Sequence, residues 1–166
     1  MIIREEQQSD HEAIRSVVTD AFGQPDEARL ADMLRTDGDI EIALIAELDR
    51  KLVGHVVLSR MILPEAALGL APVSVLPAFQ RQGVGSALMR AGIKRAQENG
   101  WERIFLLGEP AYYNRFGFAA ETAAGFSSPY AGPYFMALEL AENLPDRSEG
   151  VAEYASAFSR LGADEK

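Results

Sequence analysis

The chain has 166 residues, no cysteine, two histidines, a formal net charge of -9 and a pI near 4.7. Its length fits one domain, and the absence of cysteine excludes disulfides, thiolate metal sites and a cysteine nucleophile, so we expect no metal. The acidic balance argues against nucleic acid or an anionic membrane as partner, since both require a basic surface. The N-terminus turns charged at once and no uncharged run reaches the roughly 20 residues that a bilayer needs, so we expect a soluble cytoplasmic protein.

Apolar spacing and turn signals predict an alternation of strands and helices. In chain order the sequence predicts a strand over 1–5, helices over 9–21 and 25–38, strands over 40–48, 52–62 and 67–75, a helix over 83–99, a strand over 102–107, a short helix over 110–117 and a strand over 135–140. The first helix begins in this interpretation at a Ser9–Glu12 capping box. Glu41 and Glu47 alternate with apolar residues, which predicts a strand with one wet face, and residues 48–51 form a hairpin turn.

The chain after residue 140 is polar and carries few anchors. Val151, Tyr154 and Phe158 are its candidate contacts with the body, and the tail begins at Asn143. We predict one α/β domain over residues 1–145, with a tail over 146–166 that packs on it or extends it.

The segment from residue 73 to residue 88 carries the clearest chemical signal. It runs from a strand through a turn marked by Pro77 and a glycine loop into a helix. The first backbone N–H groups of a helix lack internal partners and carry partial positive charge, and glycines at 83 and 85 let a phosphate approach them. Two other nucleotide motifs fail, because Leu88 replaces the third glycine of the dinucleotide fingerprint and no Gly-Lys-Ser/Thr follows. The pattern predicts a site for a pyrophosphate.

Three segments together resemble the GNAT superfamily of N-acetyltransferases. Gln80-Arg81-Gln82-Gly83-Val84-Gly85 resembles its motif A, Arg/Gln-x-x-Gly-x-Gly/Ala, and Tyr113-Asn114-Arg115-Phe116-Gly117-Phe118 resembles its motif B. The hairpin that includes residues 52–56 resembles the segment before motif A. The resemblance covers about residues 1–140. Within the superfamily, the chain is similar to an uncharacterised bacterial branch of predicted acetyltransferases.

This resemblance implies both a fold and an activity. The fold is a mixed, mostly antiparallel sheet with helices on both faces, in which the fourth and fifth strands, residues 70–75 and 103–108, splay apart in a V. The activity is transfer of an acetyl group from acetyl-CoA, the co-substrate, directly to a primary amine of a small molecule or peptide. Pro72 agrees with a strand that stops pairing along part of its length.

The resemblance also assigns the coenzyme site. Backbone groups of Val73 and Val75 would bind the pantetheine arm, backbone N–H groups from Gln82 to Ser86 would hold the pyrophosphate, and Arg81 would add charge. The full predicted site is Val73, Ser74, Val75, Gln80, Arg81, Gln82, Gly83, Val84, Gly85, Ser86 and Asn114.

Tyr113 is the predicted general acid for the CoA thiolate, because a phenol with a pKa of about 10 stays protonated at neutral pH. An N–H near Val75 would polarise the thioester carbonyl. Tyr112 is the competitor for the acid role. Glu109 is the candidate general base, and its alternative role is a favourable charge at a helix start. His55 is interpreted as a packed or surface imidazole and not as a base. Members of the family that the chain resembles often use ordered water as the base, so water is the alternative to Glu109.

Several alternatives stay open at this stage. The aromatic residues Phe126, Tyr130, Tyr134 and Phe135 either wall the acceptor pocket or pin a loop to the core. A non-catalytic acyl-CoA-binding module and an ordinary nucleotide-binding domain are the competing functions. The acceptor amine and the acyl length are not identified, and homodimerisation, the commonest oligomeric state, is not decided by any sequence feature.

Overall fold

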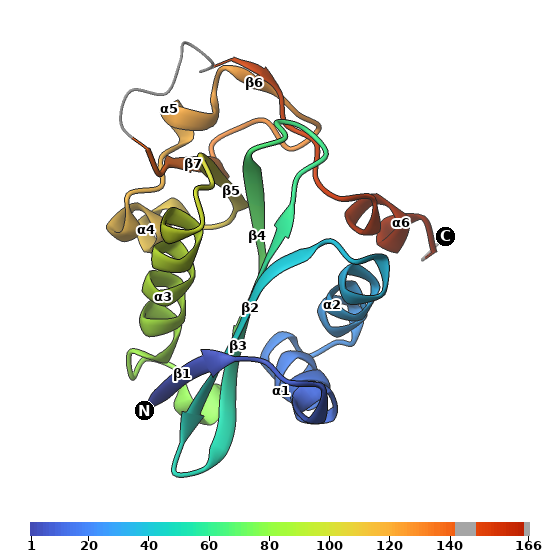
Figure 1. The fold of residues 1–166 in the computed structure, drawn as a ribbon, viewed down its shortest axis with the longest axis vertical. Helices are drawn as coiled ribbons and strands as arrows, with labels where there is room; N and C mark the ends of the chain where they lie inside the picture. Colours follow the sequence, from blue (N-terminus) through green and yellow to red (C-terminus); the bar gives the residue numbers. More distant parts are fainter. Residues whose placement is uncertain (142–148, 165–166) are drawn as a thin grey trace.

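The computed structural model describes residues 1–141 and 149–164, with side chains as far as residue 161 (Figure 1). Six strands form one sheet in the order β1-β2-β3-β4-β5-β7. They are β1 (Ile2–Glu5), β2 (Ile40–Leu48), β3 (Lys51–Arg60), β4 (Ala67–Val75), β5 (Arg103–Leu107) and β7 (Phe135–Glu139). Neighbouring strands are antiparallel except for the parallel pair β4 and β5. The predicted mixed, mostly antiparallel sheet is therefore confirmed.

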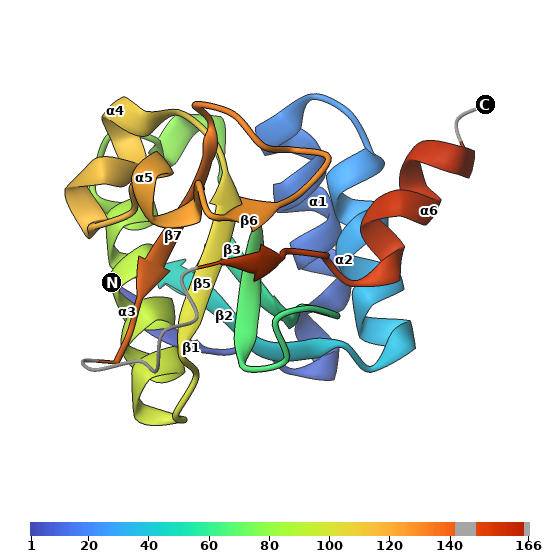
Figure 2. The same cartoon turned by 90° about the horizontal axis from the view of Figure 1, so that it is seen from above.

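Helices cover both faces of this sheet, as Figures 1 and 2 show. The helices are α1 (His11–Phe22), α2 (Asp26–Asp37), α3 (Val84–Glu98), α4 (Pro110–Tyr113), α5 (Ala120–Ala123) and α6 (Ser156–Asp164). One face carries α1 and α2, with α6 packed beside α2, and the other carries α3 and α4. No helix within residues 1–141 and 149–164 is long and apolar enough to span a membrane.

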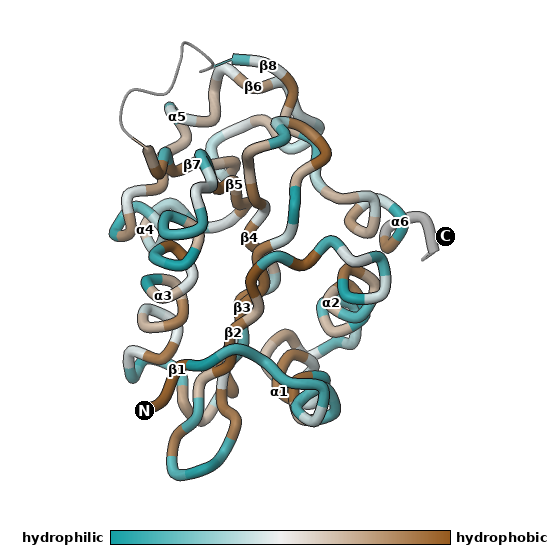
Figure 3. The backbone as a smooth tube through the Cα atoms, viewed as in Figure 1, coloured by the Kyte–Doolittle hydropathy of each residue, from teal (hydrophilic) through white to brown (hydrophobic). Residues whose placement is uncertain are grey.

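The centre of the sheet is apolar on both faces (Figure 3). In β2 the residues from Ala43 to Ala46 are all buried, and only the strand ends with Glu41 and Glu47 reach solvent. The predicted wet face is therefore wrong. Helices pack on both sides of the strand, which the two acidic residues at its ends do not reveal.

The first α-helix begins two residues later than predicted. The Ser9–Glu12 capping box is wrong, because α1 starts at His11 after a 3-10 turn over Gln8–Asp10. The Asp10 carboxylate instead accepts a bond from the Gln7 N–H at 2.7 Å and pairs with Arg4 of β1 at 2.8 Å. The capping box thus forms between Gln7 and Asp10, two residues before the predicted one.

The C-terminal tail carries more structure than its polarity suggests. It adds β8 (Gly150–Val151), which pairs with β6 (Phe126–Ser127), and the helix α6. The rings of Tyr154 and Phe158 lie 4.9 Å apart and anchor it, whereas Val151 is half exposed and does not. The predicted boundary between residues 145 and 146 and the tail start at residue 143 lie outside the described residues.

The two strands expected to splay do separate. Pairing between β4 and β5 joins Ala67–Gly69 to Arg103–Phe105 and stops there. On its other edge β4 pairs with β3, where a register shift places residues 71 and 72 opposite Val57. Pro72 therefore lies at a bulge, as its missing N–H predicts. Beyond this point one edge of β4 has no strand partner among the residues that the structure describes.

Candidate active site

A cavity of about 560 Å³ lies where β4 has left β5. Three elements form its wall: the end of β4, the loop and first turn of α3, and the α4 region. The lining residues are Val73, Ser74, Val75, Gln80, Arg81, Gly83, Gly85, Ser86, Tyr112, Tyr113 and Arg115. The fold thus brings most of the predicted coenzyme residues together with the predicted acid, Tyr113.

The end of β4 presents backbone groups to this cavity. The Leu76 N–H donates to the Val53 carbonyl at 2.8 Å, and alternate residues of an antiparallel strand bond to the same neighbour. Val73 and Val75 therefore direct their N–H and C=O groups to the opposite edge. The Gln80 side chain donates to the Val75 carbonyl at 3.0 Å, so this acceptor already has one partner. An extended chain containing amides could pair along this edge as an added strand does.

The first turn of α3 supplies a second set of backbone donors. The first bond into the helix runs from the Ala87 N–H to the Gly83 carbonyl at 3.0 Å, so the amides of residues 84–86 precede it and lack a helical acceptor. Positive φ angles at Arg81 (63°) and Gly83 (85°) bend the loop around this turn. These amides carry the partial positive charge of the helix start, which suits a phosphate group.

Gly85 is required by a close neighbour rather than by its backbone angles. A Cβ atom at this position would lie 2.9 Å from the Tyr112 hydroxyl. Tyr112 therefore reaches the first turn of α3 across the cavity. The Arg115 guanidinium lies 4.7 Å from the Tyr112 ring centroid and adds positive charge on the same side.

Tyr113 occupies a different part of the cavity from its neighbour. Its ring lies against Gly108 at the end of β5, where an added Cβ would be only 2.3 Å from a ring carbon. Burial, with a smaller contribution from Tyr112, raises the pKa of Tyr113 to about 12. Its hydroxyl is therefore protonated at neutral pH.

The sequence interpretation named Tyr112 only as a competitor for the acid role, and it did not name Arg115. Tyr112 directly precedes the motif that contains Arg115, and Arg115 follows Tyr112 by three residues, which places the two side chains on one face of a helical turn. That spacing is the signal that could have found them.

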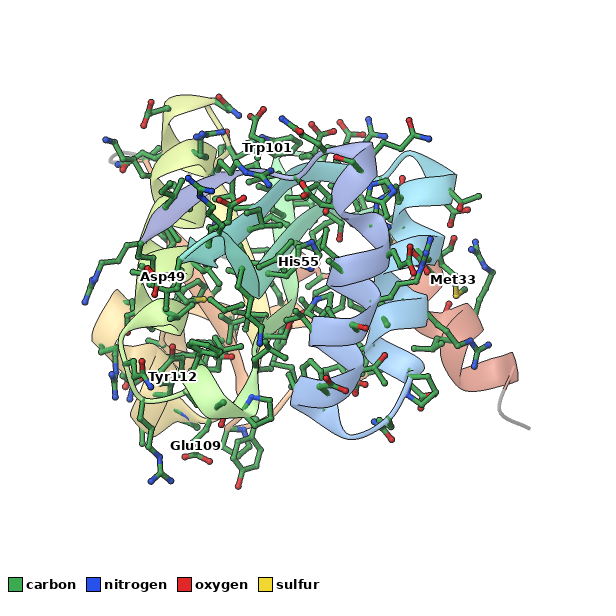
Figure 4. All side chains as sticks on the ribbon, turned by 90° about the horizontal axis from the view of Figure 1, so that it is seen from below. Met33, Asp49, His55, Trp101, Glu109 and Tyr112 are labelled. Carbon is green, nitrogen blue, oxygen red and sulfur yellow. The ribbon has the colours of Figure 1, made fainter. Side chains whose placement is uncertain are left out.

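Four predicted side chains do not line the cavity. Gln82 is exposed and donates to the Ala78 carbonyl at 3.3 Å, Asn114 is exposed, and Val84 is buried in the core. Glu109 is exposed at the start of α4, where its backbone carbonyl accepts from the Tyr113 N–H at 3.1 Å. Figure 4 shows Glu109 and Tyr112 at the same end of the molecule. The carboxylate position suits the helix start, and its role as a base stays a prediction.

The aromatic residues before β7 divide into two pairs. Phe126 and Phe135 are buried against Phe105, with ring centroids 5.0 and 5.5 Å away. Tyr130 and Tyr134 are exposed. The first pair pins the loop to the core, and only the second pair is free to contact an acceptor. Across the described parts of the chain, no three acidic or histidine side chains gather into a metal-binding group.

The geometry is that of an acyl-CoA transferase: an unpaired strand edge, free helix-start amides and a protonated phenol around one cavity. Residues 3–118 match the family model described as the Acetyltransferase (GNAT) family. The chain belongs to the GNAT family of acetyltransferases. This confirms the predicted family, fold and enzyme class, and the members of this family use acetyl-CoA as co-substrate.

Two curated relatives from Escherichia coli strain K12 are named uncharacterized N-acetyltransferases. YjhQ is 38% identical over 134 residues, which cover 76% of this chain and 72% of the relative. YhbS is 31% identical over 167 residues, which cover 97% of this chain and 100% of the relative.

Two solved structures share the fold and contain the coenzyme. The structure of E. coli YhbS in complex with CoA matches with a TM-score of 0.88 and 30% identity over 96% of this chain and 92% of that one. A GNAT family acetyltransferase from Brucella melitensis in complex with acetyl-CoA matches with a TM-score of 0.79 and 32% identity over 95% and 97% of the two chains.

Proposed function

We propose that this enzyme moves an acetyl group from acetyl-CoA directly to a primary amine inside the cavity between β4 and α4. The observation that carries the proposal is the convergence of the free β4 edge, the free amides of α3 and the Tyr113 hydroxyl on one space. A coenzyme that spans all three would place its thioester beside the phenol.

The backbone would do most of the coenzyme binding. Amides of residues 84–86 face the pyrophosphate, and Arg81 and Arg115 add charge at the rim. The outward N–H and C=O groups of Val73 and Val75 pair with the amides of the pantetheine arm.

Transfer requires alignment, charge stabilisation and a proton for the leaving thiolate. Holding the amine against the thioester can supply roughly 7–11 kcal/mol. An outward N–H of β4 near Val75 that does not pair with the pantetheine arm would polarise the carbonyl while the C–N bond forms. The C–S bond then breaks, and Tyr113 gives its proton to the sulfur.

Tyr113 is favoured over Tyr112 by position. The Tyr112 hydroxyl lies at Gly85, on the phosphate side, whereas the Tyr113 ring lies at Gly108, where the strands part. We therefore assign coenzyme binding to Tyr112 and acid catalysis to Tyr113.

Paired phenylalanine substitutions test this assignment. Tyr113→Phe should lower turnover at least about tenfold, since acid catalysis is typically worth more than that, and should leave CoA affinity nearly unchanged in calorimetry. Tyr112→Phe is the matched control and should weaken CoA binding more than it lowers turnover. Unchanged turnover in Tyr113→Phe would remove this residue from the mechanism.

The acceptor is best sought by thiol release from acetyl-CoA with a panel of polyamines, amino acids, amino sugars and peptides. Thiol release that requires an amine and falls in Tyr113→Phe supports direct transfer. CoA binding without release in any arm would support the non-catalytic module instead. The cytoplasmic location and the homodimer stay predictions.

A further inference from the structure

A second polar group lies behind β4, on the face covered by α1 and α2. Its centre is Glu6, just after β1, whose carboxylate accepts bonds from Arg35 Nε at 2.8 Å and Nη2 at 3.0 Å. His55 Nε2 lies 2.8 Å from Glu6 Oε1, and His11 Nε2 lies 3.2 Å from Oε2. We call Glu6, Arg35, His11 and His55 the Glu6 cluster.

His55 is fully buried, so of the two interpretations, a packed or a surface imidazole, the structure supports the packed one. Figure 4 places it in the middle of the molecule, beside α1. Its Nδ1 atom has no hydrogen-bond partner among the described residues, and neither has the buried Oγ atom of Ser74. Because buried polar atoms are nearly always paired, two such atoms in one place call for an explanation.

These two atoms belong to directly opposite residues. His55 of β3 pairs with Ser74 of β4 in the antiparallel register. The Cβ atoms of such a pair lie about 4.5–5.5 Å apart, so a serine rotation or a single water can link the two side chains. Ser74 also lines the coenzyme cavity. Its hydroxyl is itself buried, so it lies beneath the cavity surface, on the same face of the sheet as the imidazole.

The other end of the group also reaches open space. Glu6 and Arg35 line a separate cavity of about 330 Å³ together with Glu5, Gly38 and Glu41. Ser74, His55 and Glu6 thus form a series of polar groups from the coenzyme cavity to this second cavity.

We propose that His55, acting through the Ser74 hydroxyl, accepts the proton that the attacking amine loses. This inference rests on the proposed function. As the C–N bond forms, the amine proton passes to Ser74, whose own proton passes to His55 Nδ1. The C–S bond breaks and the thiolate takes the Tyr113 proton. Exchange with solvent then returns one proton to Tyr113 and removes one from His55 by way of the second cavity.

The charges around His55 suit this role. The groups facing it are Glu6 from the β1 loop, Arg35 from α2, His11 of α1 through Glu6, and Ser74 from β4. Burial alone would raise the pKa of Glu6, but hydrogen bonds from His55 and Arg35 outweigh it and lower the pKa to about 2. Glu6 therefore stays ionised, fixes Nε2 and stabilises the imidazolium that proton transfer creates.

NMR with CoA as the probe tests the link without any acceptor. The chain has only two histidines, so a His11→Gln variant assigns both ring signals. Saturation with CoA should move the His55 signals, and Ser74→Ala should remove most of that response. The His11 signals of the unsubstituted protein should hardly change.

A His55 signal that ignores CoA, while calorimetry shows that CoA binds, would overturn the inference and leave the proposed function standing. Absence of CoA binding would overturn both. A response of His55 that persists in Ser74→Ala would exclude serine as the link and also overturn the inference.

Kinetics with the fastest amine of the panel provide the second readout. Ser74→Ala and His55→Gln should each lower kcat about tenfold or more, leave the KM for acetyl-CoA unchanged and alter the acid side of the pH profile of kcat. Ser59→Ala, which removes another buried and unpartnered hydroxyl on β3, is the matched control and should change neither. Unaltered pH profiles in both test variants would contradict the proposal.

Discussion

The coenzyme cavity and the Glu6 cluster lie on opposite sides of β4 and are built in different ways. The cavity presents backbone groups of residues 73–86 beside side chains such as Arg81, Tyr112 and Arg115. The Glu6 cluster takes its polar groups from side chains on α1, α2, β3 and the loop after β1. Backbone groups survive most substitutions, whereas a buried set of charged side chains depends on each member. The two regions should therefore respond differently to single substitutions.

The largest expected effect is on stability, from Glu6→Gln. The pKa of Glu6 is about 2 in the fold against an ordinary 4.5, so ionised Glu6 stabilises the fold above about pH 4.5. That contribution, on the order of 3 kcal/mol, is lost as the pH falls through the folded pKa. Denaturant titrations between pH 7 and about pH 2 should show that the free energy of unfolding falls more steeply with decreasing pH in the unsubstituted protein than in Glu6→Gln. If the free energies of unfolding of the two proteins changed with pH in parallel, ionised Glu6 would not stabilise the fold.

An intermediate effect is expected in the backbone site, from Gly83→Ala. Gly83 and Gly100 share a φ of 85° and neither has an atom within 4 Å of an added Cβ, so each alanine should cost about 1–2 kcal/mol of stability. Only Gly83 lies beside the helix-start amides of the cavity. Gly83→Ala should therefore weaken CoA binding about tenfold in calorimetry, while Gly100→Ala leaves it unchanged. Equal CoA affinities in the two variants would place the pyrophosphate elsewhere.

The smallest effect is expected from Glu5→Gln, the matched control for Glu6. Glu5 pairs with Arg95 at 2.6 Å, but its side chain is 74% exposed. An exposed pair is screened by water and salt, so its loss should change the free energy of unfolding by less than the scatter of a denaturant titration. A shift as large as that of Glu6→Gln would show that burial is not what distinguishes the two carboxylates.

The same contrast explains which features were predictable. The predicted strands and main helices all form. They were predictable because the spacing of apolar residues and the turn residues Pro25, Gly38 and Pro77 determine local structure within a few positions. The motif around Gly83 was informative because the backbone N–H groups that it supplies belong to consecutive residues of the chain. The Ser9 cap was wrong because the capping box forms two residues earlier, between Gln7 and Asp10. The wet face of β2 was wrong because the two helix layers act from a distance.

What the sequence by itself determined is the family, the coenzyme loop from residue 80 to residue 86 and the tyrosine of the second motif, since each is written in consecutive residues. Only the tertiary structure decided that Tyr112 reaches Gly85, that Glu109 stays outside the cavity, and that Glu6 lies against His55, 49 positions away. Short-range geometry follows from the order of residues along the chain. A contact between distant side chains depends instead on strand register and helix packing, which arise from the fold as a whole.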